Sequence, residues 1–178
     1  MRRTGYGITL DVPAGWASSI ARRPTDAGAD AAARGIAPPD AADGGPVERT
    51  LPVLHVCSRA IPTGTGDFGS GLVEELASED VFVALVEYGS DLAGTGLFAR
   101  SGWPRLAPSQ FSPGRMPRQL PGRSASQHFF SVGGRAFCLY TVIGSHSRRM
   151  ATVPRAAGVV RSMGVESAVA MRRKGVVL

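Results

Sequence analysis

The sequence has one lysine, two cysteines and three histidines among its 178 residues, so several kinds of site lack their usual residues. No apolar run approaches the roughly 20 residues that a membrane-spanning helix needs. Cys57 and Cys138 are too few for a disulfide framework, and no C-x-x-C pair is present. The arginines after Met1 are not followed by the apolar stretch of a secretory signal, which predicts a cytoplasmic location with both cysteines reduced.

The composition is that of a globular protein, with 43% hydrophobic and 19% charged residues. We expect a single domain over residues 1–165. Residues 24–46 are almost entirely Ala, Asp, Gly and Pro, and they predict a disordered insertion because they offer too little apolar surface to offset the entropy of ordering. Residues 166–178, which contain Arg172-Arg173-Lys174, are predicted to be a mobile basic tail.

Strand patterns are strongest in two places. Residues 81–86 are apolar on both faces, which predicts a central strand of a covered sheet. Residues 129–143 predict a β-hairpin, because Gly133-Gly134 supplies the two positive φ angles of a type I′ turn. That register sets Phe130 opposite Phe137 on one face and Phe129 opposite Cys138 on the other. Helical spacing over residues 153–163 predicts a covering helix.

Charge is distributed unevenly along the chain. Residues 60–99 contain seven acidic and no basic residues, whereas residues 100–178 contain thirteen basic residues and one acidic residue. The basic half could face an acidic partner or a nucleic acid. We favour a simpler interpretation, in which the acidic segment lies beside the basic one and neutralises part of it. The arginines are scattered, so we expect no nucleic-acid partner.

A glycine-rich stretch over residues 64–71 matches the G-x-G-x-x-G pattern of dinucleotide-binding loops through Gly64, Gly66 and Gly69. A short helix is predicted after it, over about residues 71–78. The pattern lies between a predicted strand and this helix, but Asp67 would bring a carboxylate toward the pyrophosphate. Nucleotide or small-ligand binding here is therefore the alternative hypothesis, and no cofactor is expected.

Other chemistry has weaker support. His55 and Cys57 are two residues apart on a predicted strand, so they share a face, but no further metal ligands lie nearby in the sequence. No G-x-S-x-G nucleophile motif is present. We expect no metal site and no catalytic residue, and hence no enzyme.

Residues 89–125 form a long segment, rich in Pro, Gly and Arg, with no predicted helix or strand. Long loops of this kind are often functional. One interpretation is that its apolar residues, such as Trp103 and Phe111, fix the loop over the sheet as a roof. The other is that its arginines bind an acidic protein surface, since arginine is enriched at interfaces. These arginines are Arg100, Arg105, Arg115, Arg118 and Arg123.

Three features resemble the PsbP-like superfamily, which includes photosystem II extrinsic proteins and Ran-binding import factors. They are the opening residues 6–16 with their Pro13-x-Gly15-Trp16 turn, the paired strands 127–143, and the closing helix that runs into residues 160–165. The resemblance implies an α+β fold, an antiparallel sheet covered by helices on both faces. It also implies a binding or assembly role. We therefore expect a non-catalytic protein-binding or assembly module from a bacterial branch of this superfamily.

Overall fold

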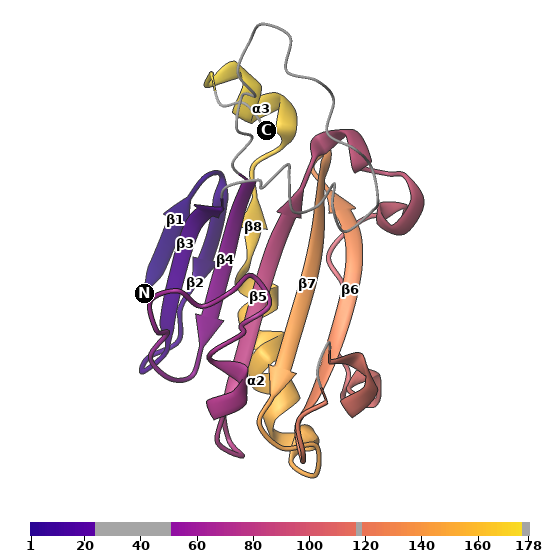
Figure 1. The fold of residues 1–178 in the computed structure, drawn as a ribbon. Coiled ribbons are helices and arrows are strands. Elements are labelled where there is room, and N and C mark those ends of the chain that lie inside the picture. The colour runs from indigo at the N-terminus through magenta and orange to yellow at the C-terminus, as the bar shows by residue number, and fades with distance from the viewer. Residues whose placement is uncertain (24–50, 117–118, 176–178) are drawn as a thin grey trace, which may run out of the picture.

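The computed structural model describes residues 1–23, 51–116 and 119–175, which are mainly strands (Figure 1). The predicted insertion at 24–46 lies outside these residues. The larger antiparallel sheet has the order β3-β4-β5-β7-β6. Its strands are β3 (Ala17–Arg23), β4 (Leu51–Cys57), β5 (Val81–Tyr88), β6 (Ser124–Val132) and β7 (Arg135–Ile143).

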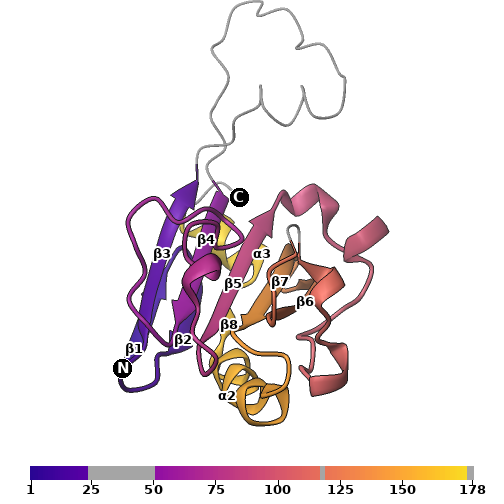
Figure 2. The same ribbon diagram turned by 60° about the horizontal axis from the view of Figure 1, so that its bottom comes forward.

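A smaller antiparallel sheet and the longer of the two described helices lie behind the five-stranded sheet in Figure 1. The small sheet contains β1 (Arg2–Gly5), β2 (Ile8–Asp11) and β8 (Gly164–Val165), and the helix is α2 (Arg149–Ser162). Figure 2 shows α2 crossing one face of the large sheet. Ile8, Leu139 and Val160 belong to one buried cluster, so the small sheet, the large sheet and the helix share a core.

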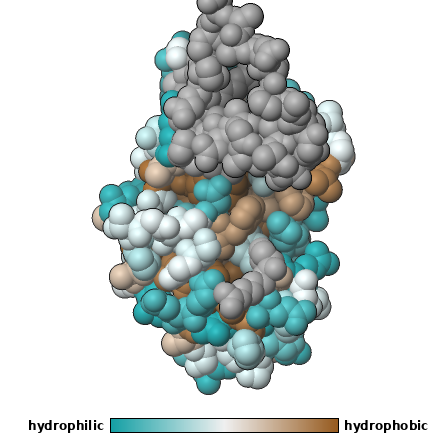
Figure 3. All heavy atoms as spheres, viewed as in Figure 1, coloured by the Kyte–Doolittle hydropathy of each residue, from teal (hydrophilic) through white to brown (hydrophobic). Residues whose placement is uncertain are grey.

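The opposite face of the large sheet is covered by loops, so the predicted α/β/α sandwich with helices on both faces is wrong. The predicted helix at 71–78 is only a 3-10 turn, η1 (Val73–Glu75). Gly69 and Gly71 have φ angles of 83° and 85°, which an α-helix cannot accommodate. Leu72, Val73 and Leu76 are nevertheless buried against this face. Figure 3 shows hydrophobic surface among hydrophilic side chains on this side.

The predicted hairpin and central strand are confirmed. Gly133 and Gly134 have φ angles of 63° and 73°, and Phe130 pairs with Phe137 while Phe129 pairs with Cys138. β5 lies between β4 and β7, and its residues are buried from Val81 to Glu87. The presence of apolar residues on both faces of these strands thus predicted their positions in the covered sheet correctly.

Two segments near the C-terminal end differ from expectation. The helix predicted over 153–163 begins at Arg149, so Pro154 lies inside α2 and not in its first turn. Where a mobile tail was expected, residues Ala168–Arg173 form a short helix, α3, capped by the Ser167 hydroxyl, which accepts from the Ala170 amide. Ala168 and Met171 are buried, because α3 packs its apolar side on the rest of the chain. Neither described helix has the length and apolar character that crossing a membrane requires.

A buried arginine connects distant parts of the fold. The side chains of Arg135 in β7 and Glu87 in β5 are 0% and 1% exposed and form a two-pronged ion pair, with distances of 2.7 Å and 2.6 Å. The same guanidinium donates to the carbonyls of Tyr6, Gly7 and Glu166 at 3.1–3.3 Å. All five N–H groups of Arg135 are therefore used. Burial raises the pKa of Glu87, and the hydrogen bonds from Arg135 oppose this shift.

Candidate functional site

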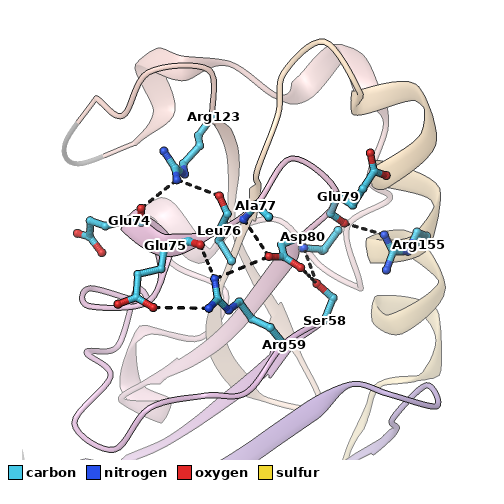
Figure 4. Close-up of polar contacts among 11 residues, drawn as sticks. Ser58, Arg59, Glu74, Glu75, Leu76, Ala77, Glu79, Asp80, Arg123 and Arg155 are labelled. Carbon is cyan, nitrogen blue, oxygen red and sulfur yellow. Dashed lines mark hydrogen bonds and ion pairs between the residues drawn. The ribbon is translucent and has the colours of Figure 1, made fainter.

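The acidic segment lies beside the basic half and neutralises part of it, as predicted, through the pairs Glu79–Arg148 and Glu87–Arg135. Glu79 pairs with Arg148 through its carboxylate, and its carbonyl accepts from Arg155 at 2.7 Å. Arg123 donates through Nη2 to the carbonyls of Glu74 and Leu76, at 2.9 Å each (Figure 4). Many of the arginines between residues 123 and 155 therefore stabilise the fold, and only the remaining arginines are candidates for binding a partner.

Arg59 completes this network from the strand side. Its guanidinium lies 3.7 Å from the Glu75 carboxylate and 3.9 Å from that of Asp80 (Figure 4). Asp80 also accepts from the Ser58 hydroxyl at 2.8 Å and from the Ala77 amide at 2.9 Å. The cluster ties the loop around η1 to the end of β4. Glu75 and Asp80 therefore have a structural role in this cluster, and we do not interpret them as a pair of acid–base catalytic groups.

The five arginines predicted for partner binding do not act as one group. Arg123 is held by the loop around η1, and Arg118 lies outside the described residues. Arg100, Arg105 and Arg115 are exposed. The charges of Arg100 and Arg115 help burial to lower the pKa of His128, so these two lie near β6. Arg105 lies in a different setting, beside α2.

The loop also serves as a roof, as the other interpretation predicted. The Trp103 ring packs on Phe130 with 5.3 Å between centroids, and Phe111 is 3% exposed in the same cluster. On the other face, Phe98 packs edge-on against Phe129 at 5.5 Å. Backbone bridges from Ser101 and Ser112 to β6 fix the loop along this edge of the sheet. A loop held in this way presents its exposed arginines from a rigid support.

A groove of about 560 Å³ lies between residues 103–106 of this loop and α2. We call it the arginine groove. Apolar side chains from both walls line it, and Arg105 and Arg161 contribute the two charged groups. The lining residues are Trp103, Pro104, Arg105, Leu106, Ala157, Val160, Arg161 and Met163.

Neither charged group of the arginine groove has a counter-ion among the described residues. Arg105 and Arg161 are exposed, and neither guanidinium forms an ion pair or hydrogen bond within the described part of the chain. A guanidinium binds a carboxylate with two parallel hydrogen bonds, and it does so more strongly beside an apolar surface that excludes water. The arrangement therefore suits a ligand with negative charge on either side of an apolar group.

Arg161 was missed in the sequence, although Arg105 was predicted. Its helix was recognised, but the apolar positions of α2 were assigned only to the core. The available signal was the contrast between Arg161 and its neighbours: Val160 belongs to the core cluster, and Ala157, one helical turn earlier, is buried beside the groove. An arginine at the border of the apolar face of a helix holds its charge close to any segment or ligand that packs against that face.

The glycine-rich stretch does not have the geometry of a dinucleotide site. Such a site places the pyrophosphate at a helix N-terminus, but the turn that follows, η1, has three residues. Gly69 has a packing role, because a Cβ there would lie 2.6 Å from the Phe82 ring. Gly64 has a φ of 81°, and a Cβ at Gly66 would meet the Ser70 hydroxyl at 2.2 Å. The three glycines thus permit tight turns and close packing.

His55 and Cys57 lie on one face of β4, as expected, but each has a structural role. The Nε2 atom of His55 is 2.9 Å from the Asp67 carbonyl, and burial lowers the pKa of this histidine. Burial raises the pKa of Cys57, which is 0% exposed and so remains a thiol. Across the described residues, no three His, Cys, Asp or Glu side chains are grouped to hold a metal ion.

Three buried polar atoms without a hydrogen-bond partner gather under the roof. Among the described residues, Ser126 Oγ, His128 Nε2 and Thr141 Oγ1 are unpaired. Ser126 and Thr141 are directly opposite in the β6–β7 pairing, and His128 lies two residues along β6, so all three share the face that carries Phe130 and Leu139. These groups reduce stability, because a buried polar group without a partner loses its hydration.

Replacing Thr141 with valine should raise the free energy of unfolding by about 1 kcal/mol, since it removes an unpaired hydroxyl and keeps the shape. Urea unfolding monitored by circular dichroism measures this. Thr152→Val is the matched control: this threonine is also 0% exposed, but its hydroxyl donates to the Arg148 carbonyl at 3.1 Å. The Thr152→Val variant should lose about 1 kcal/mol of unfolding free energy. A loss at Thr141 as well would mean that an internal water completes its hydrogen bonds.

A scan against family models, a search of curated proteins and a search of solved structures each give no match to this chain. The PsbP-like resemblance therefore stays a prediction, and the functional argument depends on the site.

Proposed function

We propose that this chain is a non-catalytic binding module that docks an acidic segment of a partner protein in the arginine groove. One observation carries the proposal: Arg105 and Arg161, two exposed arginines with no counter-ion in the described part of the chain, border a groove with an apolar lining. The preferred segment would insert one large apolar side chain and place Asp or Glu on either side of it. Buried apolar anchors with charged neighbours are the usual source of affinity at such interfaces.

The apolar lining favours a protein over a nucleic acid. Val160 and Met163 of the lining belong to the core cluster, and Trp103 is the one aromatic residue of the lining and already packs against Phe130, so the groove offers mainly aliphatic side surfaces. A sugar-phosphate backbone would satisfy the arginines and leave this surface uncovered. A peptide with an apolar anchor satisfies both.

A peptide-display selection against the intact protein tests the proposal. We expect enrichment of peptides with one large apolar residue flanked by acidic residues. Binding of a synthetic peptide from that class should weaken by about 30-fold in the double variant Arg105→Glu, Arg161→Glu, because two attractions become repulsions. Fluorescence anisotropy gives the dissociation constants, and thermal unfolding should change little because both side chains are exposed.

The matched control is Arg172→Glu, Arg173→Glu, which changes the net charge equally at exposed positions of α3. It should alter affinity by less than about threefold at physiological salt, because screening limits the reach of distant charges. Equal weakening by both double variants would mean that attraction is non-specific. Enrichment of peptides without acidic residues would also refute the proposal.

A further inference from the structure

A second cavity lies on the loop-covered face of the sheet, away from the arginine groove. It has a volume of about 280 Å³, and its apolar lining comes from Phe68, Val73, Met116 and Leu120, with Tyr140 of β7 also lining it. Tyr140 belongs to the cluster on this face, whereas Leu139, its neighbour, belongs to the opposite one. We call this space the tyrosine cavity. It adjoins the glycine-rich stretch but takes its lining mainly from apolar side chains.

The hydroxyl of Tyr140 is the polar group that makes this cavity unusual. The residue is 1% exposed and its hydroxyl forms no hydrogen bond with any described residue, but this oxygen is not among the fully buried unpaired atoms, so it meets the open space of the cavity. Its ring is fixed by an edge-on contact with Phe68, at 5.5 Å between centroids. Buried tyrosine hydroxyls usually have a partner, because leaving one unpaired costs stability. A hydroxyl that lines a cavity and lacks a partner can receive one from a bound molecule.

The charges around the cavity limit what that molecule can be. Asp67 and Glu74 are also part of the lining, and they disfavour any anion, including a nucleotide or a carboxylic acid. Glu74 already accepts a hydrogen bond from the Gly71 amide at 2.9 Å. Burial raises the pKa of Tyr140 to about 12, so the phenol remains uncharged and can both donate and accept.

We propose that the tyrosine cavity binds a small uncharged ring compound that carries one hydroxyl or carbonyl oxygen, with that oxygen hydrogen-bonded to Tyr140. The size is suitable, since an apolar cavity of about 150 Å³ can hold benzene. The apolar walls supply the contact with the ring, and Tyr140 supplies the orientation. This site is independent of the arginine groove, which lies on the other face of the sheet.

Phenol is the probe, and the intact protein is titrated while the Met116 methyl signal is followed by NMR. We expect a saturable shift of that signal and contacts between the phenol ring and the methyl group. Tyr140→Phe should weaken phenol binding about fivefold, because it keeps the ring and removes the hydrogen bond. The melting temperature of this variant should change little, since the Tyr140 hydroxyl has no described partner to lose and, unlike the Thr141 hydroxyl, is not fully buried. Tyr6→Phe, which alters an exposed tyrosine, should bind phenol unchanged.

Two further arms make the outcome decisive. Leu120→Trp should fill the cavity and abolish the Met116 shift, and a normal thermal transition shows that this variant is folded. Benzoate and benzylamine test charge: benzoate should not bind, and benzylamine should bind more weakly than phenol. Tighter binding of benzylamine would instead assign the cavity to organic cations and overturn the proposal. So would a phenol affinity that Tyr140→Phe leaves unchanged, or the absence of any saturable shift.

Discussion

Replacing Arg135 with methionine should lower the free energy of unfolding by about 3–5 kcal/mol, because it breaks the two-pronged ion pair that holds Glu87 in the core. Glu87 is 1% exposed, so water cannot replace the guanidinium without opening the sheet. The substitution also removes the donors for the carbonyls of Tyr6, Gly7 and Glu166, which loosens the β1–β2 turn and the segment before α3. Denaturant unfolding at neutral pH measures the loss.

The double variant Arg135→Met, Glu87→Leu distinguishes the cost of leaving a buried carboxylate without Arg135 from the net value of the ion pair. Apolar replacement of both partners is often neutral or stabilising, so this variant should recover most of the loss. The three backbone carbonyls still lack the Arg135 donor in it, although that of Gly7 keeps its bond from the Glu166 amide at 2.7 Å, so a deficit of about 1–3 kcal/mol should remain. A single-variant loss below about 1 kcal/mol would show that the pair contributes little.

The strands of the central sheet could be predicted because their signals are local. Residues 81–86 and 135–143 carry apolar side chains at consecutive positions, and Gly133-Gly134 fixes the turn and hence the register. The pairing of Phe130 with Phe137 then follows from counting outward from the turn. No distant residue needs to be known for this inference.

The layers around that sheet could not be predicted in the same way. β8 has two residues and pairs with β2 across more than 150 positions, and the Arg135 hydrogen bonds span 128 and 129 positions to Gly7 and Tyr6. Neither leaves a periodic pattern in the sequence. The loop-covered face was misjudged because the buried residues around Leu72 were expected to lie on a helix. The glycines beside them favour turns, which bury side chains equally well.

One of the two arginines of the arginine groove could be predicted from the sequence. Arg105 was predicted because it lies in a long proline-rich loop, but the same argument selected Arg123, which holds backbone carbonyls of the fold. Composition alone cannot separate these roles, since both arginines have prolines nearby. What separates them is whether a carboxylate or carbonyl lies within reach, and that depends on which segments the fold brings together. Arg161 required knowledge of the wall opposite its helix.

Phe137→Ala should cost about 3–5 kcal/mol of unfolding free energy, since it empties a ring-sized volume from a core that has no access to solvent. Phe137 is 0% exposed, and its ring lies 5.9 Å from that of Phe130, which in turn supports Trp103 of the groove wall. Its face also lies 5.2 Å from the Arg135 guanidinium, so the cavity would form beside the buried ion pair.

Phe129→Ala is the matched control on the same hairpin, because Phe129 is only half-buried and lies on the loop-covered face. It should lose about half as much, in proportion to the smaller area returned to water. Guanidinium unfolding with an unchanged m-value measures both losses. If Phe137→Ala costs less than about 1 kcal/mol, or less than Phe129→Ala, then the face beneath α2 is not the principal core. In that case the wall that positions Trp103 and Arg105 would have no rigid support, and the groove would have to be formed by its ligand.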